Sequence, residues 1–182
     1  MAIFLISDTH FEHTSMYEKV YAGNRLRPWN TYAEGDNIII ERWNNTVNES
    51  DTVFHLGDII GQTEESLSVL ARLNGNKVLI RGNHDTGDLA LYTKYFSNVY
   101  GCYELGDLLL THIPAHPMLR CKNLANVHGH MHGLMMDVDP WYFDVSVEVI
   151  NYTPILLEDL LIKIKERQES PNQFTYNHIS CI

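Results

Sequence analysis

The sequence predicts an α/β fold in which two β-sheets are packed together and flanked by helices. In the first half, short apolar runs alternate with amphipathic segments, a pattern typical of βα units and a mainly parallel sheet. In the second half, further apolar runs follow one another with short connections, which indicates a second group of strands. The run at residues 2–6 is continuously apolar, so its strand should be covered on both faces.

The elements can be placed along the chain from apolar periodicity and turn residues. The expected strands are residues 2–6, 52–56, 77–80, 99–105, 107–111, 125–128 and 141–150. The expected helices are residues 36–48, 64–73, 88–96 and 158–165. Residues 7–13 form a polar loop, residues 14–35 a long irregular excursion, and residues 166–182 a polar tail. We find no repeat or linker, so residues 1–182 are expected to form one domain.

Individual residues predict a cap, a buried face and a turn in these elements. Asp36 is placed to cap the helix of residues 36–48, whose apolar side chains recur at three-to-four spacing. In the next helix, Leu67, Leu70 and Ala71 should face inward. Gly106-Asp107 suits a tight hairpin turn between two strands.

The net charge restricts the partners of the protein. Lys and Arg total 13 and Asp and Glu total 23, for a net charge of −10. Such a chain repels polyanions as a whole, so we expect no basic face that binds nucleic acid. A phosphate-bearing substrate would need local positive charge, which bound metal ions could supply.

The cysteines and the N-terminus bear on location. Cys102, Cys121 and Cys181 are odd in number and form no close pair, so a disulfide framework is not expected. The chain opens directly on an apolar strand, without the basic region of a signal peptide, and no run reaches the ~20 residues of a membrane span. We therefore expect a cytoplasmic protein without a membrane partner.

Five short polar stretches each follow an apolar run and give the chain its chemical character. They are Asp8-Thr9-His10, Gly57-Asp58, Gly82-Asn83-His84-Asp85, Thr111-His112 and Gly129-His130-Met131-His132. Because α/β proteins place their sites where strands end, we expect these stretches to meet at one point. Imidazole and carboxylate together bind divalent transition metals, and no cysteine lies in the stretches to form a thiolate zinc site.

The spacing of two stretches is suited to ligands. In Asp8-Thr9-His10 and His130-Met131-His132, the candidate ligands are two positions apart, and in extended backbone such side chains point the same way. Taken alone, the first three stretches are more often ordinary turns, and His112 is more often a satisfied histidine near the core. The exception is His130-Met131-His132. Of the other histidines, His55 and His128 lie on expected strands as packing residues, and His116 rivals His112 but lies between prolines.

The ordered set DxH, GD, GNHD, H and GHxH resembles the calcineurin-like metallophosphoesterase superfamily over roughly residues 4–132. The segments 6–13 and 145–154 are similar to its small, single-domain bacterial and phage branch. This branch more often has glycine where Glu12 stands, and Val-Gly-Val-Asp where this chain has Val145-Ser146-Val147-Glu148. The resemblance implies a four-layer αββα sandwich of two mixed sheets flanked by helices.

The resemblance also implies a site for two divalent metal ions. Asp8, His10 and His132 would hold one ion, and Asn83, His112 and His130 the other, with Asp58 bridging them. Mixed oxygen and nitrogen ligands favour Mn²⁺, with Fe²⁺, Co²⁺, Ni²⁺, Zn²⁺ or Mg²⁺ as alternatives.

His84 is left free for catalysis in this scheme. It would bind the phosphoryl group and protonate the leaving alkoxide, while Asp85 holds its ring in one tautomer. Weaker candidates for binding the substrate are His13, Arg25 and Arg27, for which a surface position is at least as reasonable.

The expected function is hydrolysis of a phosphodiester or phosphomonoester by a metal-bridging hydroxide, on a small-molecule substrate that could be a nucleotide. Two alternatives remain open: a nuclease acting on polynucleotides and a non-catalytic metal-binding member of the fold. Neither the substrate nor the oligomeric state follows from the sequence.

Overall fold

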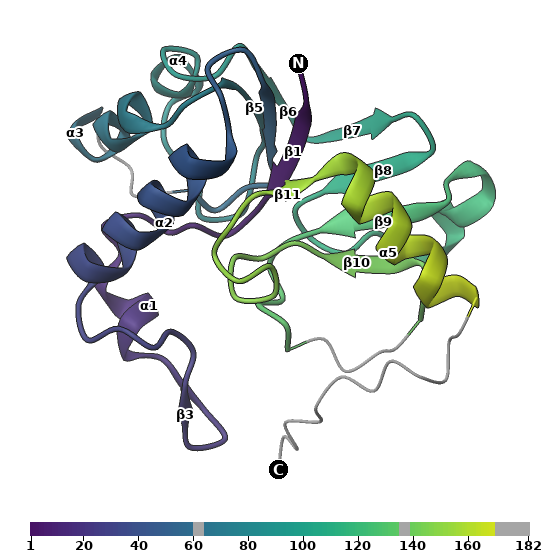
Figure 1. Ribbon diagram of the computed structural model, residues 1–182, viewed down its shortest axis with the longest axis horizontal. Coiled ribbons are helices and arrows are strands. Elements are labelled where there is room, and N and C mark those ends of the chain that lie inside the picture. Colours follow the sequence, from purple (N-terminus) through teal and green to yellow (C-terminus); the bar gives the residue numbers. More distant parts are fainter. Residues whose placement is uncertain (60–63, 135–138, 170–182) are drawn as a thin grey trace.

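Two β-sheets packed face to face and flanked by helices form the protein, as the fold class predicted (Figure 1). The computed structural model describes residues 1–59, 64–134 and 139–169. Most of the predicted polar tail and Cys181 lie outside the described residues. None of the helices in the described part of the chain is long and apolar enough to cross a membrane.

The first sheet has the strand order β11-β1-β4-β5-β6 and is mixed. Its strands in that order are Ile155–Leu156, Ile3–Ile6, Thr52–His55, Asn76–Ile80 and Asn98–Tyr100. Strands β1, β4, β5 and β6 are parallel, and only β11 is antiparallel to its neighbour. Ile6 pairs with His55, and His55 pairs with Leu79, so β1, β4 and β5 end within one residue of the same level. The loops that follow these strands therefore lie at one edge of the sheet.

The second sheet has the order β10-β9-β8-β7 and is also mixed. Its strands in that order are Tyr142–Asp144, Ala125–His128, Leu108–Thr111 and Cys102–Leu105. The predicted turn at Gly106-Asp107 joins antiparallel β7 and β8, and β8, β9 and β10 are parallel. A bridge between Ser7 and Ser146 links the two sheets where β1 and β10 end.

Helices and a small hairpin complete the described chain. The helices are α1 (Thr14–Glu18), α2 (Tyr32–Thr46), α3 (Glu64–Leu67), the 3-10 helix η1 (Ser68–Arg72), α4 (Leu89–Tyr92), the 3-10 helix η2 (Pro117–Lys122) and α5 (Leu157–Glu169). The hairpin consists of β2 (Val20–Tyr21) and β3 (Asn24–Arg25).

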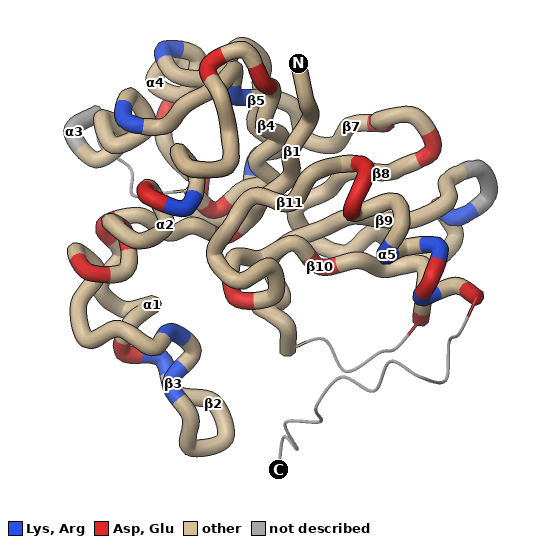
Figure 2. Tube along the Cα trace, in the orientation of Figure 1, with Lys and Arg blue, Asp and Glu red and all other residues tan. Residues whose placement is uncertain are grey.

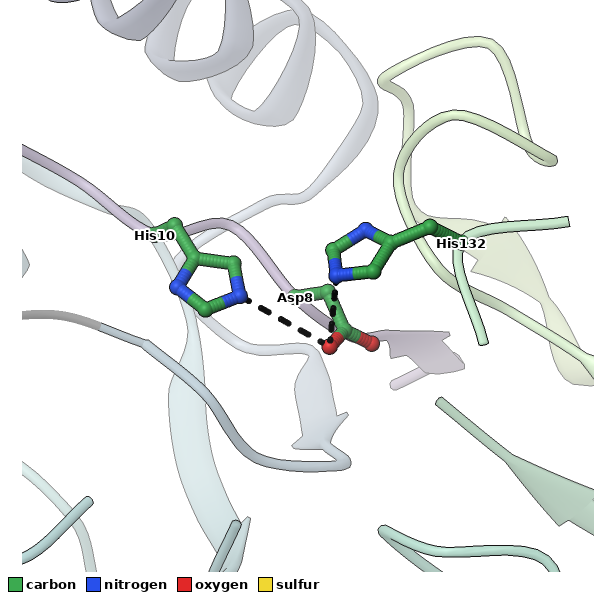
Figure 3. A group of neighbouring side chains, drawn as sticks. All are labelled: Asp8, His10 and His132. Carbon is green, nitrogen blue, oxygen red and sulfur yellow. Dashed lines mark ion pairs between the residues drawn. The ribbon is translucent and has the colours of Figure 1, made fainter. Parts of the chain in front are cut away.

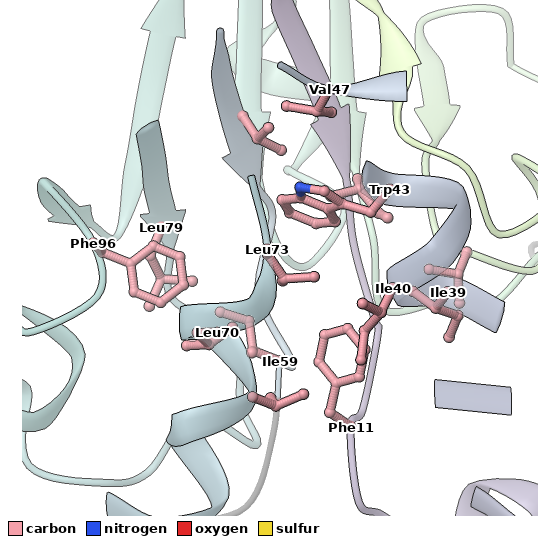
Figure 4. Close-up of a cluster of buried hydrophobic side chains, with 14 of the residues drawn as sticks. Phe11, Ile39, Ile40, Trp43, Val47, Ile59, Leu70, Leu73, Leu79 and Phe96 are labelled. Atoms are coloured by element: carbon pink, nitrogen blue, oxygen red, sulfur yellow. The ribbon is translucent and has the colours of Figure 1, made fainter. Parts of the chain in front are cut away.

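Alternate side chains of the first sheet enter two separate cores. On its outer face, Ile6 and Leu79 pack with Trp43 of α2 and Leu70 of η1, in the cluster of Figure 4. On its inner face, side chains of β1, β4 and β5 meet those of β8 and β9, and α5 adds Leu160 and Ile164. Both faces of β1 are therefore covered, as its continuous apolar run predicted.

The first predicted helix begins earlier than expected. Helix α2 starts at Tyr32, and Thr31 is its N-cap, accepting a hydrogen bond from the Glu34 N–H. Asp36 is not a cap but a buried helix residue that accepts hydrogen bonds from the Tyr17 hydroxyl and the Glu12 N–H. The first three residues of the helix are exposed and a glycine follows them, so apolar periodicity did not reveal this turn.

Several other predicted boundaries were wrong. The predicted strand 99–105 is two strands in different sheets, separated by Gly101. The predicted strand 141–150 ends at Asp144. Val145 and Val147 are buried in the core although their backbone is irregular, so their apolar pattern resembled a longer strand. Helix 64–73 is part α and part 3-10 with Ala71 exposed, helix 88–96 is α-helical only to Tyr92, and α5 continues through Glu169 into the predicted tail. Strand β11 was not predicted.

His55 at the end of β4 is buried, as expected of a packing residue. The Gly57 N–H donates to its Nδ1, so its Nε2 carries the proton and donates to the Thr9 hydroxyl at 3.0 Å. That hydroxyl in turn donates to the Ile59 carbonyl. Burial lowers the pKa of His55 from 6.5 to about 3, so the ring stays neutral and supports the loops after β1 and β4.

We predict that His55 makes the protein sensitive to acid. As the pH falls below 6.5, the unfolded chain binds a proton on His55 that the folded protein binds only near pH 3, so stability is lost toward low pH. His55→Gln should remove up to ~1.4 kcal/mol per pH unit from the slope of unfolding free energy. Urea titrations of chelated protein across this range measure the slope, and exposed His116→Gln is the control. An unchanged slope in His55→Gln would refute this origin.

Candidate functional site

The loops after β1, β4, β5, β8 and β9 meet at one edge of the sandwich, as the predicted convergence of polar stretches requires. Hydrogen bonds between loops hold them together: the Asp8 N–H donates to the Gly57 carbonyl and the His10 N–H to the Asp58 carbonyl. The Gly129 N–H donates to the His112 carbonyl across the second sheet. Residues more than a hundred positions apart thereby form one site.

Asp8, His10 and His132 form the first cluster of potential metal ligands (Figure 3). The Oδ1 atom of Asp8 lies 3.9 Å from Nε2 of His10 and 3.7 Å from Nε2 of His132. Both Asp8 Oδ1 and His10 Nε2 are buried without a hydrogen-bond partner. Buried polar atoms rarely lack a hydrogen-bond partner, and the convergence of these two atoms indicates a site for a cation.

Asp58, His112 and His130 form the second cluster. The Nε2 atom of His112 lies 3.3 Å from Oδ2 of Asp58 and 2.9 Å from Oδ1 of Asn83. Because Nδ1 of His112 faces the Leu56 carbonyl at 2.7 Å and must donate to it, Nε2 of a neutral ring is an acceptor. Three acceptors then converge, an arrangement that a cation stabilises.

Asp58 stands between the two clusters. Its Oδ2 lies 3.7 Å from Nε2 of His10 and 3.3 Å from Nε2 of His112, so it borders both groups. Its Oδ1 accepts the His84 N–H at 2.8 Å and is therefore occupied. A single oxygen of Asp58 thus lies near a histidine nitrogen of each cluster.

Asp8 divides its two oxygens in the same way. Its Oδ2 accepts the His130 N–H at 2.8 Å and lies 3.1 Å from the Ser146 hydroxyl, while Oδ1 stays free. The hydrogen bonds fix the orientation of the carboxylate and aim one oxygen into the site.

Most of the candidate ligands have backbone that L-residues rarely adopt. Positive φ angles occur at Asp8 (60°), His10 (46°), Asp58 (56°), His130 (68°) and His132 (50°). The side chains of each i, i+2 pair therefore do not converge through extended backbone, as the spacing suggested, but through left-handed turns. Such conformations cost about 1–3 kcal/mol each and persist where surrounding contacts enforce them, often at functional sites.

Two glycines allow the loops to approach closely. A Cβ atom at Gly129 would lie 2.2 Å from Oδ2 of Asp8, and one at Gly82 would lie 2.2 Å from Oδ1 of Asp58. Each glycine therefore makes room for the occupied oxygen of a candidate ligand, which explains why glycine precedes the polar residues at both strand ends.

Electrostatics favour a cation in the first cluster. Burial raises the pKa of Asp8 to about 6, which is the cost of a carboxylate removed from water. Burial also holds the pKa of His10 well below its usual value, so its imidazole is neutral, the form that binds metal. The donor set, the free acceptor atoms and the buried charge all fit divalent ions held by Asp8, His10 and His132 and by Asp58, Asn83, His112 and His130.

His84 and His13 lie beside the first cluster without belonging to it. The exposed His84 ring has its centroid 5.4 Å from that of His10, and its backbone N–H is bound to Asp58. The His13 ring lies 5.3 Å from His10 and 5.9 Å from His84. Its Nδ1 is 3.2 Å from Nδ1 of His10, so one of these atoms donates to the other.

Asp85 does not hold the His84 ring, contrary to our expectation. Its two oxygens accept the N–H groups of Asp58, Ile59 and Gly82 at 2.8–3.0 Å. The carboxylate therefore ties the loop after β4 to the loop after β5, and both of its oxygens are occupied by backbone N–H groups.

Arg25 and Arg27 were weighed as substrate ligands or surface residues; Arg25 has a surface position, and Arg27 has neither role. Arg25 is exposed on β3 and binds Oδ1 of Asn30 at 2.7 Å. Arg27 is fully buried behind the site, where its Nε contacts Glu148 and its other nitrogens bind the carbonyl oxygens of Asp8 and Thr9. Its donors are directed at protein acceptors, so it is not placed to bind substrate.

Ser146 and Glu148 were missed as site residues. The Ser146 hydroxyl accepts the His132 N–H at 3.2 Å and contacts Asp8, while Oε2 of Glu148 lies 2.9 Å from Nδ1 of His132. A signal was present in the sequence, because these two positions depart from the pattern of the branch that the chain resembles.

His116 and His128 are structural. His116 caps η2 at the surface and accepts the Met118 N–H, which removes it as a rival to His112. His128 is buried in β9, as expected, and its Nδ1 is 2.8 Å from the Gly129 carbonyl.

Comparison with known proteins connects this geometry to a family. A family model described as calcineurin-like phosphoesterase matches residues 1–180. The uncharacterized protein MJ1445 of Methanocaldococcus jannaschii is 35% identical over 174 residues, which cover 91% of this chain and 92% of that protein.

Solved structures are also similar to this chain. The protein of unknown function AQ665 from Aquifex aeolicus shares the fold, with a TM-score of 0.68 and 23% identity over 89% of this chain and 98% of that one. The Pseudomonas putida nuclease MPE matches with a TM-score of 0.46 and 22% identity, over 71% and 61% of the two chains.

The position of Asp58 predicts that one substitution weakens both ions. Asp58→Asn keeps an oxygen for the His84 N–H but turns an amide NH₂ toward His10 and His112, where the carboxylate oxygen now lies. Calorimetric titration with Mn²⁺ should show both affinities reduced. The matched control is Asp88→Asn at the N-cap of α4, where asparagine caps equally well. One ion bound as in the unmodified protein would exclude a bridging role.

Proposed function

Because the chain belongs to the calcineurin-like phosphoesterase family, we propose that it is a dinuclear metal-dependent hydrolase of small phosphate esters. The observation that carries this proposal is the pair of ligand clusters, with Oδ2 of Asp58 near a histidine of each. Each cluster presents acceptor atoms directed at a common point. Two neighbouring metal ions are suited to a phosphoryl group, which carries negative charge on several oxygens.

The proposed ligands follow the two clusters. Asp8, His10 and His132 hold one ion, Asn83, His112 and His130 hold the other, and Asp58 contacts both. Two bound divalent ions would lower the pKa of a water molecule and neutralise charge on the phosphoryl group. We propose Mn²⁺ first, because mixed imidazole, carboxylate and amide ligands without thiolate suit it.

His84 is the proposed general acid. Its backbone N–H is bound to Asp58, and its exposed ring lies 5.4 Å from the His10 ring, centroid to centroid, without a ligand role in either cluster. An imidazole there can donate a hydrogen bond to a phosphoryl oxygen and a proton to the leaving alkoxide. The His13 ring lies beside that of His84, with the two ring centroids 5.9 Å apart.

The substrate is proposed to be a small phosphate ester, and a nucleotide is one candidate. The net charge of −10 disfavours long polyanions. Lys and Arg are scattered in Figure 2 near β3, near α3 and α4, and along α5, with no continuous basic stripe among the described residues. The cysteine pattern supports a cytoplasmic location as part of the same proposal.

A metal-loaded activity panel tests the function. We expect aryl phosphates, cyclic nucleotides or dinucleotides to be hydrolysed after addition of Mn²⁺, and a chelator to abolish the activity. Two ions per chain should be found by elemental analysis. Protein that binds no transition metal and gains no activity with Mn²⁺ would refute the proposal. Activity on polynucleotides that falls steeply with salt would indicate a nuclease instead.

His84→Ala should lower kcat by ~10²–10⁴ without loss of metal, since the backbone N–H at this position would still donate to Asp58. The loss should be greater for an alkoxide leaving group than for nitrophenolate, which leaves without a proton. Both substrates and the metal content are measured on one preparation, with the exposed His116→Ala as control. Equal losses on the two substrates would make His84 a phosphate binder, and loss of an ion would make it a ligand.

A further inference from the structure

Arg27 is a fully buried cation from the excursion before α2, and its contacts lead to the site. Its Nε lies 2.8 Å from Oε1 of Glu148. Its NH1 binds the Thr9 carbonyl at 2.9 Å and the Tyr17 hydroxyl at 3.2 Å, and its NH2 binds the Asp8 carbonyl at 2.7 Å. All three guanidinium nitrogens are therefore engaged by fixed protein groups.

Glu148 connects Arg27 to a candidate metal ligand, His132. Its Oε1 is taken by Arg27, and its Oε2 lies 2.9 Å from Nδ1 of His132. A carboxylate accepts hydrogen bonds, so the proton of His132 is on Nδ1 and the lone pair is on Nε2. That Nε2 is the atom 3.7 Å from Oδ1 of Asp8.

The network is asymmetric between the two clusters. Arg27 fixes the backbone of Asp8, which has positive φ, and through Glu148 it fixes the ring of His132. In the second cluster, His112 is oriented by the Leu56 carbonyl instead. Among the described residues, the hydrogen bonds of the Arg27 and Glu148 side chains reach no side chain of that second cluster.

We propose that Arg27 and Glu148 are positioning residues for one ion only, the ion held by Asp8, His10 and His132. This inference rests on the proposed dinuclear function and adds that the two ions depend on different supports. Outer partners of metal-bound histidines commonly contribute ~10–100-fold to metal affinity. Loss of Glu148 should therefore weaken one ion selectively.

Glu148→Gln tests the proposal, because an amide has only one acceptor oxygen. The charged Arg27 should retain that oxygen, which turns the NH₂ toward His132. Nδ1 of His132 then accepts, and the proton moves to Nε2, where it blocks the atom directed at the ion. Imidazole ¹⁵N NMR of the metal-free proteins, recorded at a pH where His132 is neutral, should show the Nδ1–H tautomer before the substitution and the Nε2–H tautomer after it.

Metal affinity is measured in two backgrounds that isolate the ions. In His130→Ala, the remaining ion is that of the first cluster, and Glu148→Gln should raise its Kd by ~10–100-fold. In His10→Ala, the remaining ion is that of the second cluster, and the same substitution should leave its Kd unchanged. Asp139→Asn, which breaks the more exposed Arg120–Asp139 ion pair, is the control and should change neither value.

The outcomes separate this proposal from the function on which it rests. An unchanged His132 tautomer, or equal weakening of metal in the two backgrounds, would overturn the positioning role. Absence of metal binding in the unsubstituted protein would refute the proposed function, whereas the tautomer would still decide whether Glu148 orients His132. Should Glu148→Gln fail to fold because Arg27 loses its counter-charge, Arg27→Gln with Glu148→Leu removes both buried charges and the acceptor for Nδ1 of His132, and it should raise the Kd in His130→Ala only.

Discussion

Two buried carboxylates, Asp8 and Asp58, determine how the site can be built. A carboxylate removed from water must be satisfied by hydrogen bonds or by a cation. In both residues, one oxygen accepts a backbone N–H from another loop and the second faces imidazoles. The Asp8 carboxylate joins loops of the two sheets, and the Asp58 carboxylate joins two loops of the first sheet, so the interactions that align these candidate ligands also hold the loops together.

The geometry is maintained by contacts around the ligands. The left-handed backbone at Asp8 is held by Arg27 and by the hydrogen bond from Asp8 to Gly57, and Gly129 leaves space for the Asp8 carboxylate. At Asp58, Asp85 and Gly82 have the corresponding roles. Several independent contacts fix these two strained residues, so their side chains are held in place before any ion binds.

The fold class and the convergence of polar stretches were predictable because strand ends and apolar runs leave local patterns. The side chains that support the candidate ligands were not predictable in this way. Arg27 lies in a segment without periodicity, and nothing nearby in the sequence marks it as buried beside Glu148, 121 positions later. Asp85 was assigned to its neighbour His84, yet its partners lie mainly on the loop after β4. Long-range hydrogen bonds of this kind depend on tertiary structure, which periodicity does not encode.

The excursion that supplies Arg27 has a consequence for how related chains can diverge. A surface loop beside a catalytic mouth is ordinarily free to vary in length and to acquire new specificities. Here the loop is anchored by Arg27 to Asp8 and Glu148, and by Tyr17 to Asp36 in α2. Transplanting or shortening it would remove an internal part of the site, so variation should concentrate at its β2–β3 tip and not at its base.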